Sequence, residues 1–147
     1  MDDAWLEALT FEECSRLLES QSVGRIAVVV NDFPVVFPVN YRLVGAREPR
    51  WIALRTRPGN VLDRAPMHAA FEIDALDSAH REGWSVLVRG TLHHADPTAA
   101  DFRERFDPDP WILDDRNAWL VVEPFSITGR RLHAGEPAWA FHIRSYL

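Results

Sequence analysis

The chain has 147 residues, of which 47% are hydrophobic, and its formal net charge is -6 at pH 7. This length and composition predict one folded domain, residues 1–147, and exclude a disordered chain. The acidic balance argues against nucleic acid as a partner, because such binding needs a basic surface that neutralises phosphates. All 16 basic residues are arginine, so a phosphate contact must come from arginine, a hydroxyl or the main chain.

Two features of the sequence predict a cytoplasmic location. Cys14 is the single cysteine, which excludes an internal disulfide and a cysteine metal cluster and fits a reducing compartment. The N-terminal stretch MDDAWLEALT is acidic and lacks the layout of a signal peptide. No apolar run approaches the roughly 20 residues of a membrane-spanning helix, so we expect no membrane partner. Cys14 itself is expected to be a small core residue.

Two helices are predicted. Thr10 and Glu13 have the spacing of a capping box, in which each side chain accepts from the other residue's main-chain N–H. Apolar residues then fall on one stripe, so we expect a helix from about Phe11 to Ser20. A second, short helix is predicted after Asp96, a suitable N-cap that is followed by Pro97.

Alternating and β-branched residues predict six strands. Pro38 predicts an edge position or a bulge, because proline cannot donate to a sheet, and Pro124 predicts a bend or bulge in the last strand. Short turns join most of these segments, which favours an antiparallel arrangement over a parallel one. We therefore predict a mainly β (α+β) fold, an antiparallel barrel with flanking helices. In chain order the six segments are residues 22–31, 35–44, 51–56, 68–76, 83–95 and 117–133.

The segment WIALRTRPGNVL, residues 51–62, is the first candidate site. Arg55 and Thr56 end a predicted strand, and a Pro-Gly-Asn turn that predicts one helical turn follows. A guanidinium, a hydroxyl and exposed turn amides together suit a phosphate monoester. Arg57 and Arg64 would add charge. The alternative is that all of these are solvated surface residues.

Two further patterns place polar groups on apolar strands. Trp84 and Ser85 open a strand, where an indole and a hydroxyl suit a planar ligand, and the alternative is a half-buried strand with a core tryptophan. Asn40 and Tyr41 interrupt another strand, and either serve a ligand or face solvent. The histidines show no ligand spacing, so we predict no metal site and no catalytic triad.

Taken in order, four segments resemble the pyridoxamine 5′-phosphate oxidase-like family of flavin-binding split barrels. The resemblance runs from about Ser22 to Leu132, and its most specific parts are PVNY, RT-x-PGN and GWSVLVRG. It implies a six-stranded antiparallel split β-barrel that forms a homodimer. It also implies FMN, or in some branches the deazaflavin F420, in clefts at the dimer interface. The segments are SVGRIAVVVNDFPVVFPVNYRLV, WIALRTRPGNVL, AAFEIDALDSAHREGWSVLVRGT and WLVVEPFSITGRRL.

The resemblance further implies a set of cofactor-binding residues. Arg55 and Thr56 match the strand-end residues that hold the flavin phosphate, and Asn60 matches a loop position often occupied by serine. Relatives commonly read PGSK where this chain reads PGNV, so Val61 stands where a lysine would help neutralise the phosphate. The strand beside the flavin ring and the residues at its edge match Val39, Asn40, Tyr41, Trp84 and Ser85.

The resemblance implies an FMN-dependent oxidoreductase of unknown substrate, with no catalytic residue assigned, because the flavin itself carries the redox chemistry. No extra contacts for a substrate phosphate are evident, so we expect no oxidation of pyridoxamine phosphate. One alternative is an F420-dependent reductase whose acidic tail is held by Arg55, Arg57 and Arg64. Another is a non-catalytic flavin- or haem-binding protein, with His68 or His142 as the first haem ligands to test.

Overall fold

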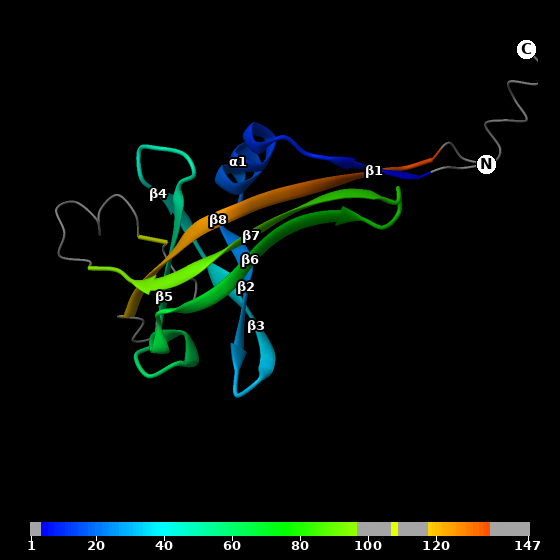
Figure 1. The fold of residues 1–147 in the computed structure, drawn as a ribbon. Helices are drawn as coiled ribbons and strands as arrows, with labels where there is room; N and C mark the ends of the chain where they lie inside the picture. The colour runs from blue at the N-terminus through cyan, green and yellow to red at the C-terminus, as the bar shows by residue number, and fades with distance from the viewer. Residues whose placement is uncertain (1–3, 97–106, 109–117, 136–147) are drawn as a thin grey trace, which may run out of the picture.

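One antiparallel sheet of eight strands curls into a half-barrel in the computed structural model, which describes residues 4–96, 107–108 and 118–135 (Figure 1). The predicted mainly β fold is confirmed. The elements are β1 (Trp5–Ala8), α1 (Phe11–Ser20), β2 (Val23–Val30), β3 (Phe33–Asn40), β4 (Arg42–Val44), β5 (Trp51–Thr56), the 3-10 helix η1 (Val61–Arg64), β6 (Met67–Asp77), β7 (Glu82–His94) and β8 (Ala118–His133).

The order of strands in the sheet explains how it curls. The order is β3-β2-β6-β7-β8-β5-β4, and β1 pairs with the C-terminal end of β8. Only Tyr41 separates β3, at one end of this order, from β4, at the other end. The chain therefore links the two ends of the sheet directly, and the sheet must bend round to allow this.

The sequence predicted six strands, and the structure differs in two places. The predicted strand over residues 35–44 divides at Tyr41, whose side chain turns into the core, so that β3 pairs with β2 and β4 pairs with β5. The strand β1 was not predicted, because it has no apolar alternation and extends only by pairing with β8. The predicted helix after Asp96 lies outside the described residues.

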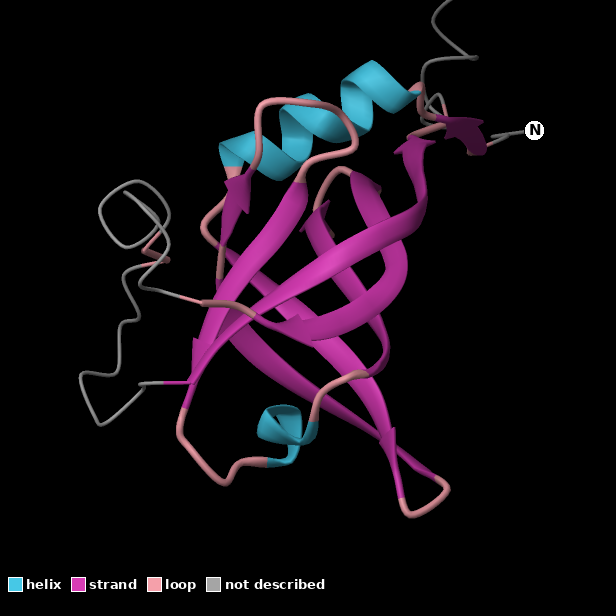
Figure 2. Ribbon diagram, turned by 60° about the vertical axis from the view of Figure 1, so that its left-hand side comes forward, coloured by secondary structure: helices cyan, strands magenta, loops and turns pink. Residues whose placement is uncertain are grey.

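The predicted helix and its capping box are confirmed. The N–H of Thr10 donates to Glu13 Oε2 (2.8 Å), and the N–H of Glu13 donates to Thr10 Oγ1 (3.2 Å). The helix lies across one end of the barrel, and η1 lies toward the opposite end (Figure 2). Cys14 and Leu18 face inward, and burial raises the pKa of the Cys14 thiol. Cys14 is thus the core residue that the sequence predicted.

Strand alternation builds the core. In β2, Ile26 and Val28 are buried, whereas Arg25 and Val29 on either side of them are exposed. The same alternation in the neighbouring strands sends one set of side chains inward and leaves the other on the outside of the barrel. The largest fully buried side chains are Phe71, Ile26, Ile52, Leu54, Leu62, Ile73, Leu92 and Leu120.

The predicted irregularity near Pro124 is a β-bulge between β7 and β8. Arg89 is opposite Ser126, but Gly90 is opposite Pro124, so Phe125 is the extra residue of β8. A Cβ on Gly90 would lie 2.2 Å from the carbonyl oxygen of Glu123, so only glycine fits there. The predicted edge position of Pro38 is also confirmed, because β3 ends the strand order.

Candidate functional site

Arg55 is held at the C-terminal end of β5 and is not a solvated surface residue. Its side chain is 16% exposed, and its Nη1 lies 3.1 Å and 3.3 Å from the two carboxylate oxygens of Asp107. The guanidinium lies over the ring of Trp119, 4.7 Å from the ring centroid, and Trp119 is its neighbour across the β5–β8 ladder. The structure thus presents a fixed, partly desolvated cation that already has a carboxylate partner.

Thr56 lies beside Arg55 in sequence, but its side chain is on the other face of the strand. It is 2% exposed and is opposite Ala118 of β8. Alternation along a strand explains the separation, since successive side chains leave opposite faces. A ligand that reaches the guanidinium of Arg55 therefore does not meet the Thr56 hydroxyl on the same surface.

Several polar groups of the loop after β5 form hydrogen bonds with other residues of the same loop. Gly59 has φ +81°, a left-handed conformation that favours glycine, and its N–H donates to Asp63 Oδ2 (2.8 Å). The side-chain oxygen of Asn60 accepts from the N–H of Leu62 (3.1 Å) and caps η1. The predicted helical turn is therefore present, and Asn60 has a structural role there. Arg57 and Arg64 are exposed.

β3 contacts β5, the strand that carries Arg55, and Val39 and Asn40 end β3 shortly before Arg42, which is opposite Ala53 of β5. The side chain of Tyr41 is buried instead. Its hydroxyl donates to the main-chain carbonyl of Leu18, its ring meets Phe71 edge-on at 4.7 Å, and burial raises its pKa. The side chain of Tyr41 is therefore not available to a ligand, and its main-chain N–H donates to the carbonyl of Ser22 (3.0 Å).

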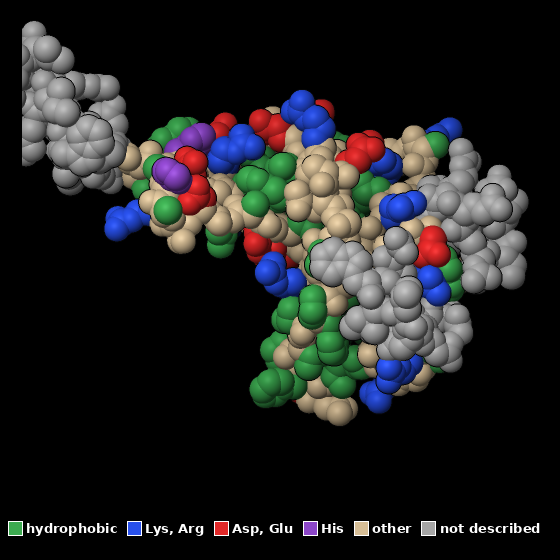
Figure 3. All heavy atoms as spheres, turned by 180° about the vertical axis from the view of Figure 1, so that it is seen from behind, with side chains coloured by type: hydrophobic (Ala, Val, Ile, Leu, Met, Phe, Trp, Pro, Cys, Tyr) green, Lys and Arg blue, Asp and Glu red, His purple; other side chains and the backbone are tan. Residues whose placement is uncertain are grey.

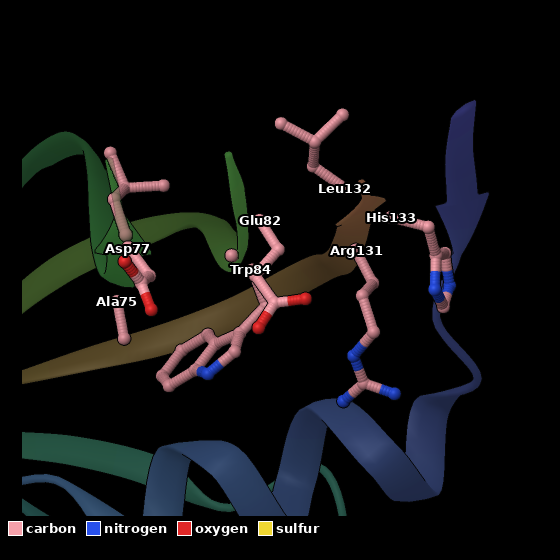
Figure 4. A pocket seen from close by; sticks show the side chains of 9 residues that line it. Ala75, Asp77, Glu82, Trp84, Arg131, Leu132 and His133 are labelled. Atoms are coloured by element: carbon pink, nitrogen blue, oxygen red, sulfur yellow. The ribbon is translucent and has the colours of Figure 1, made fainter. Parts of the chain in front are cut away.

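Trp84 and Ser85 point to opposite faces of β7. Ser85 is opposite Asp74 of β6, whereas Trp84 is opposite Ala75 of β6 and Arg131 of β8. Trp84 lines a pocket of about 410 Å³ at the end of the β6–β7 hairpin. Figure 4 shows its indole above α1, with Arg131 extending toward the same helix from β8. The two residues predicted at the flavin ring edge therefore cannot both offer side chains to one ligand on one face.

Ser85 belongs to a surface on the outside of the barrel that we call the outer face. Its centre is a charged cluster in which Arg25 Nη1 lies 2.9 Å from Asp74 Oδ2 and 3.7 Å from Glu72 Oε1. Burial and the neighbouring Asp74 raise the pKa of Glu72 to about 7. The outer face comprises Arg25, Ala27 and Val29 of β2, Pro34, Val36, Pro38 and Asn40 of β3, Ala70, Glu72 and Asp74 of β6, and Ser85, Leu87 and Arg89 of β7.

Two residues that contact Arg55 were not identified from the sequence. Asp107 lies 52 residues away in an acidic stretch that reads as an ordinary loop, and nothing local marks it as a partner. Trp119 starts a strand, but its position over Arg55 follows only from the register of β5 against β8. An arginine at the end of an apolar strand is the one signal that could have prompted a search for a distant carboxylate.

In the described part of the chain, no three potential metal-ligating side chains lie together. His68 is exposed on β6, and His142 lies outside the described residues. None of the helices in residues 4–96, 107–108 and 118–135 has the length and apolar composition needed to cross a membrane.

Comparison with known proteins agrees with this geometry. The family model described as pyridoxamine 5′-phosphate oxidase matches residues 10–131. A protein of Mycobacterium tuberculosis, the uncharacterized protein Rv0080, is 32% identical over 131 residues, which cover 84% of this chain and 83% of that one.

Two solved structures have the same fold. The FAD binding protein from Mycobacterium smegmatis is 30% identical, with a TM-score of 0.62, over 86% of this chain and 98% of the other. A conserved protein of unknown function from Corynebacterium diphtheriae is 25% identical, with a TM-score of 0.73, over 86% and 98%. From the extent of the family match and the shared half-barrel, we conclude that this chain belongs to the pyridoxamine 5′-phosphate oxidase-like family and has its FMN-binding split barrel fold.

Proposed function

We propose that this protein binds a flavin nucleotide, with its phosphate at the end of β5, and acts as a flavin-dependent oxidoreductase. The observation that carries the proposal is the guanidinium of Arg55, which is 16% exposed and fixed over Trp119 at the strand end that the family resemblance assigns to the phosphate. A planar guanidinium in a partly desolvated place is well suited to phosphate oxygens. The relative from M. smegmatis, described as an FAD binding protein, supports a flavin as the ligand.

The outer face offers a continuous path from this phosphate position toward Ser85. Asn40 ends β3, two residues before Arg42, which is opposite Ala53 of β5, and Pro38 of β3 is opposite Arg25. Arg25 donates to Asp74, which is opposite Ser85. A ligand extended along this path would place its ring system near the Ser85 hydroxyl, with Asn40 between the ring and the phosphate.

A bound flavin would supply the redox chemistry, taking up two electrons and a proton equivalent from a reduced substrate and passing them to an acceptor. The residues of the chain would bind and orient it. Arg55 would hold the phosphate, and Ser85 would donate a hydrogen bond at the ring edge, where negative charge develops on reduction. The substrate is not assigned.

We also propose that two copies associate through the outer face. Its side chains include Val29 and Val36, which are 66% and 60% exposed, and hydrophobic side chains gather over the β2–β3 hairpin (Figure 3). Pro34 and Pro38 lack the N–H that an added strand would need, so the edge of β3 is poorly suited to strand pairing. Association that buries the outer face is therefore more favourable than association by pairing of β3 edges. The clefts in which the family resemblance implies a flavin would then lie between the copies.

Titration of the apoprotein with riboflavin, FMN, FAD, F420 and haem tests the proposed function. Arg55→Ala should weaken flavin nucleotide binding about ten- to a hundredfold, the effect of losing a charged hydrogen bond. Arg55→Lys should recover part of this affinity, since it keeps the charge but not the planar fork. Arg16→Ala, an exposed position on α1, is the control that should leave affinity unchanged. Equal effects of Arg55→Ala and Arg16→Ala would remove the basis of the proposal.

A further inference from the structure

Two carboxylates and one guanidinium lie together at the centre of the outer face. Glu72 and Asp74 are two residues apart on β6, so their side chains leave the same face of the strand. Arg25 of β2 donates from Nη1 to Asp74 Oδ2 at 2.9 Å, whereas Glu72 Oε1 lies 3.7 Å from the same nitrogen, beyond hydrogen-bond distance. The guanidinium therefore neutralises Asp74, and Glu72 is the second carboxylate of a cluster with one cation.

The surroundings of Glu72 favour its protonated form. Its Oε1 is buried and has no hydrogen-bond partner in the described part of the chain. A protonated carboxyl is better suited to such a place, because it carries no charge to be desolvated and can donate to a neighbouring carboxylate. Burial, followed by the hydrogen bond and the charge of Asp74, raises the pKa of Glu72 to about 7.

The cluster lies where a second copy would cover it. Glu72 is opposite the exposed Leu87 across the β6–β7 ladder, and Arg25 is opposite Pro38 across the β2–β3 ladder. The side chains of Glu72 and Asp74 are still 34% and 23% exposed, so water solvates part of their charge in a single copy. Burial of the outer face between two copies removes this water, and a charge that loses solvation without gaining a partner is unfavourable.

We infer that Glu72 takes up a proton when two copies associate through the outer face, so that the association weakens as pH rises. The inference rests on the proposed function, because it requires the outer face to be the surface at which the copies meet. It goes beyond that function by making one carboxyl of this chain the group that couples the dimer to pH. In a dimer with twofold symmetry each copy brings the same cluster, so two equivalent Glu72 side chains contribute.

Other ionisable groups near Glu72 determine which controls are needed. The charged groups that face it are Arg25, Asp74 and Arg89. Arg130 of β8 and His68 of β6 lie further along the same side of the sheet, and β3 brings no ionisable side chain to it. Arginine keeps its charge near neutral pH, whereas histidine ordinarily titrates at about pH 6.5. His68 is therefore the group whose titration must be separated from that of Glu72.

Sedimentation equilibrium of the whole protein at pH 6 and pH 8 tests the inference. If association raises the pKa of Glu72 by about one unit in each copy, the dissociation constant of the wild-type dimer should rise about 25-fold between these two pH values. Glu72→Gln has the shape of the protonated carboxyl and cannot titrate, so its dissociation constant should change by less than about twofold. Glu12→Gln, at an exposed position of α1, and His68→Gln should both keep the wild-type dependence.

A dimer too tight for sedimentation is followed by the exchange of copies labelled with donor and acceptor dyes. Exchange should be faster at pH 8 than at pH 6 in wild type and equal at the two pH values in Glu72→Gln. This second measurement gives the same comparison when no dissociation constant can be reached.

The outcomes separate the inference from the proposed association. A wild-type protein that is monomeric at both pH values removes the proposed association, and the inference with it. A dimer whose dissociation constant or exchange rate agrees within about twofold at pH 6 and pH 8 contradicts the inference and leaves the association standing. A pH dependence that persists in Glu72→Gln, or that disappears in His68→Gln, assigns the proton to another group and also overturns the inference.

Discussion

Trp84 and Ser85 are neighbours in β7 whose side chains leave opposite faces of the sheet, so each serves a different surface. Ser85 lies on the outer face opposite Asp74, and Trp84 packs against the end of the core above α1. Successive residues of one strand therefore carry a candidate ligand contact on the outer face and a core anchor on the opposite face.

This relationship predicts separable effects of two substitutions. Ser85→Ala should weaken flavin binding about two- to tenfold, the effect of one neutral hydrogen bond, with little change in stability. Trp84→Ala should lower the free energy of unfolding by about 2 kcal/mol through lost apolar burial. Urea unfolding and flavin titration of both variants check this. If Trp84→Ala abolished binding at full stability, the ligand would have to lie on the inner side, in the pocket beside Arg131.

The buried hydroxyl of Tyr41 predicts a loss of stability in Tyr41→Phe. The hydroxyl donates to the carbonyl of Leu18, so its removal leaves a buried acceptor without its partner. We expect the free energy of unfolding to fall by about 1–2 kcal/mol. Tyr41→Leu also removes the edge contact with Phe71 and should cost more. Urea denaturation measures both, and equal stability of Tyr41→Phe and wild type would contradict the prediction.

The bulge between β7 and β8 predicts that Gly90→Ala is strongly destabilising. The new Cβ would lie 2.2 Å from the carbonyl oxygen of Glu123, which is main chain and cannot rotate away. We expect a loss of about 2–3 kcal/mol, in the range of overpacked interiors. Thermal unfolding followed by circular dichroism gives the change. Gly45→Ala is a useful comparison, because no atom lies within 4 Å of a Cβ there and only its positive φ is unfavourable.

The raised pKa of Glu72 predicts a decline in stability with pH. Burial and Asp74 raise the pKa to about 7, and the nearby cation Arg25 offsets this only in part. Between pH 4.5, the ordinary pKa of a glutamate, and about pH 7, the unfolded chain loses this proton while the folded protein keeps it. The free energy of unfolding should therefore fall as pH rises through this window.

Glu72→Gln removes this titration and isolates its effect. The variant should lack the decline and should be the more stable protein above pH 7. Urea unfolding at several pH values between 4.5 and 8 measures it. Glu12→Gln removes an exposed carboxylate of α1 and serves as the control. A slope in Glu72→Gln that is identical to wild type would show that other groups cause the pH dependence. The charged groups that face Glu72 are Arg25, Asp74 and Arg89. Arg89 lies on β7 two residues after Leu87, the residue directly opposite Glu72.

The proposed association through the outer face predicts that one added charge there separates the copies. Val36 is 60% exposed and is opposite Ala27, so Val36→Asp places a carboxylate in the apolar part of the face without touching the core. Sedimentation velocity should show a dimer for wild type and a monomer for Val36→Asp. Gln21→Glu, at an exposed position after α1 and away from the outer face, adds the same charge and is the control. A wild-type monomer at micromolar concentration would refute the association.

Local sequence patterns were sufficient to predict several parts of the structure. The helix and its capping box follow from Thr10 and Glu13, because the interactions that start a helix span only three residues. The bulge at Pro124 and the edge position of Pro38 follow from the missing N–H of proline. The family was recognisable because several such local signatures occur in a fixed order along the chain.

Contacts between distant residues required the tertiary structure. Arg55 meets Asp107 across 52 positions, Tyr41 donates to Leu18 across 23, and β1 is a strand only where β8 offers it a partner. Sequence by itself determined which segments form strands and which residues alternate along them. Only the folded chain decided the strand register and which face closes over the core, because both depend on the summed burial of many side chains.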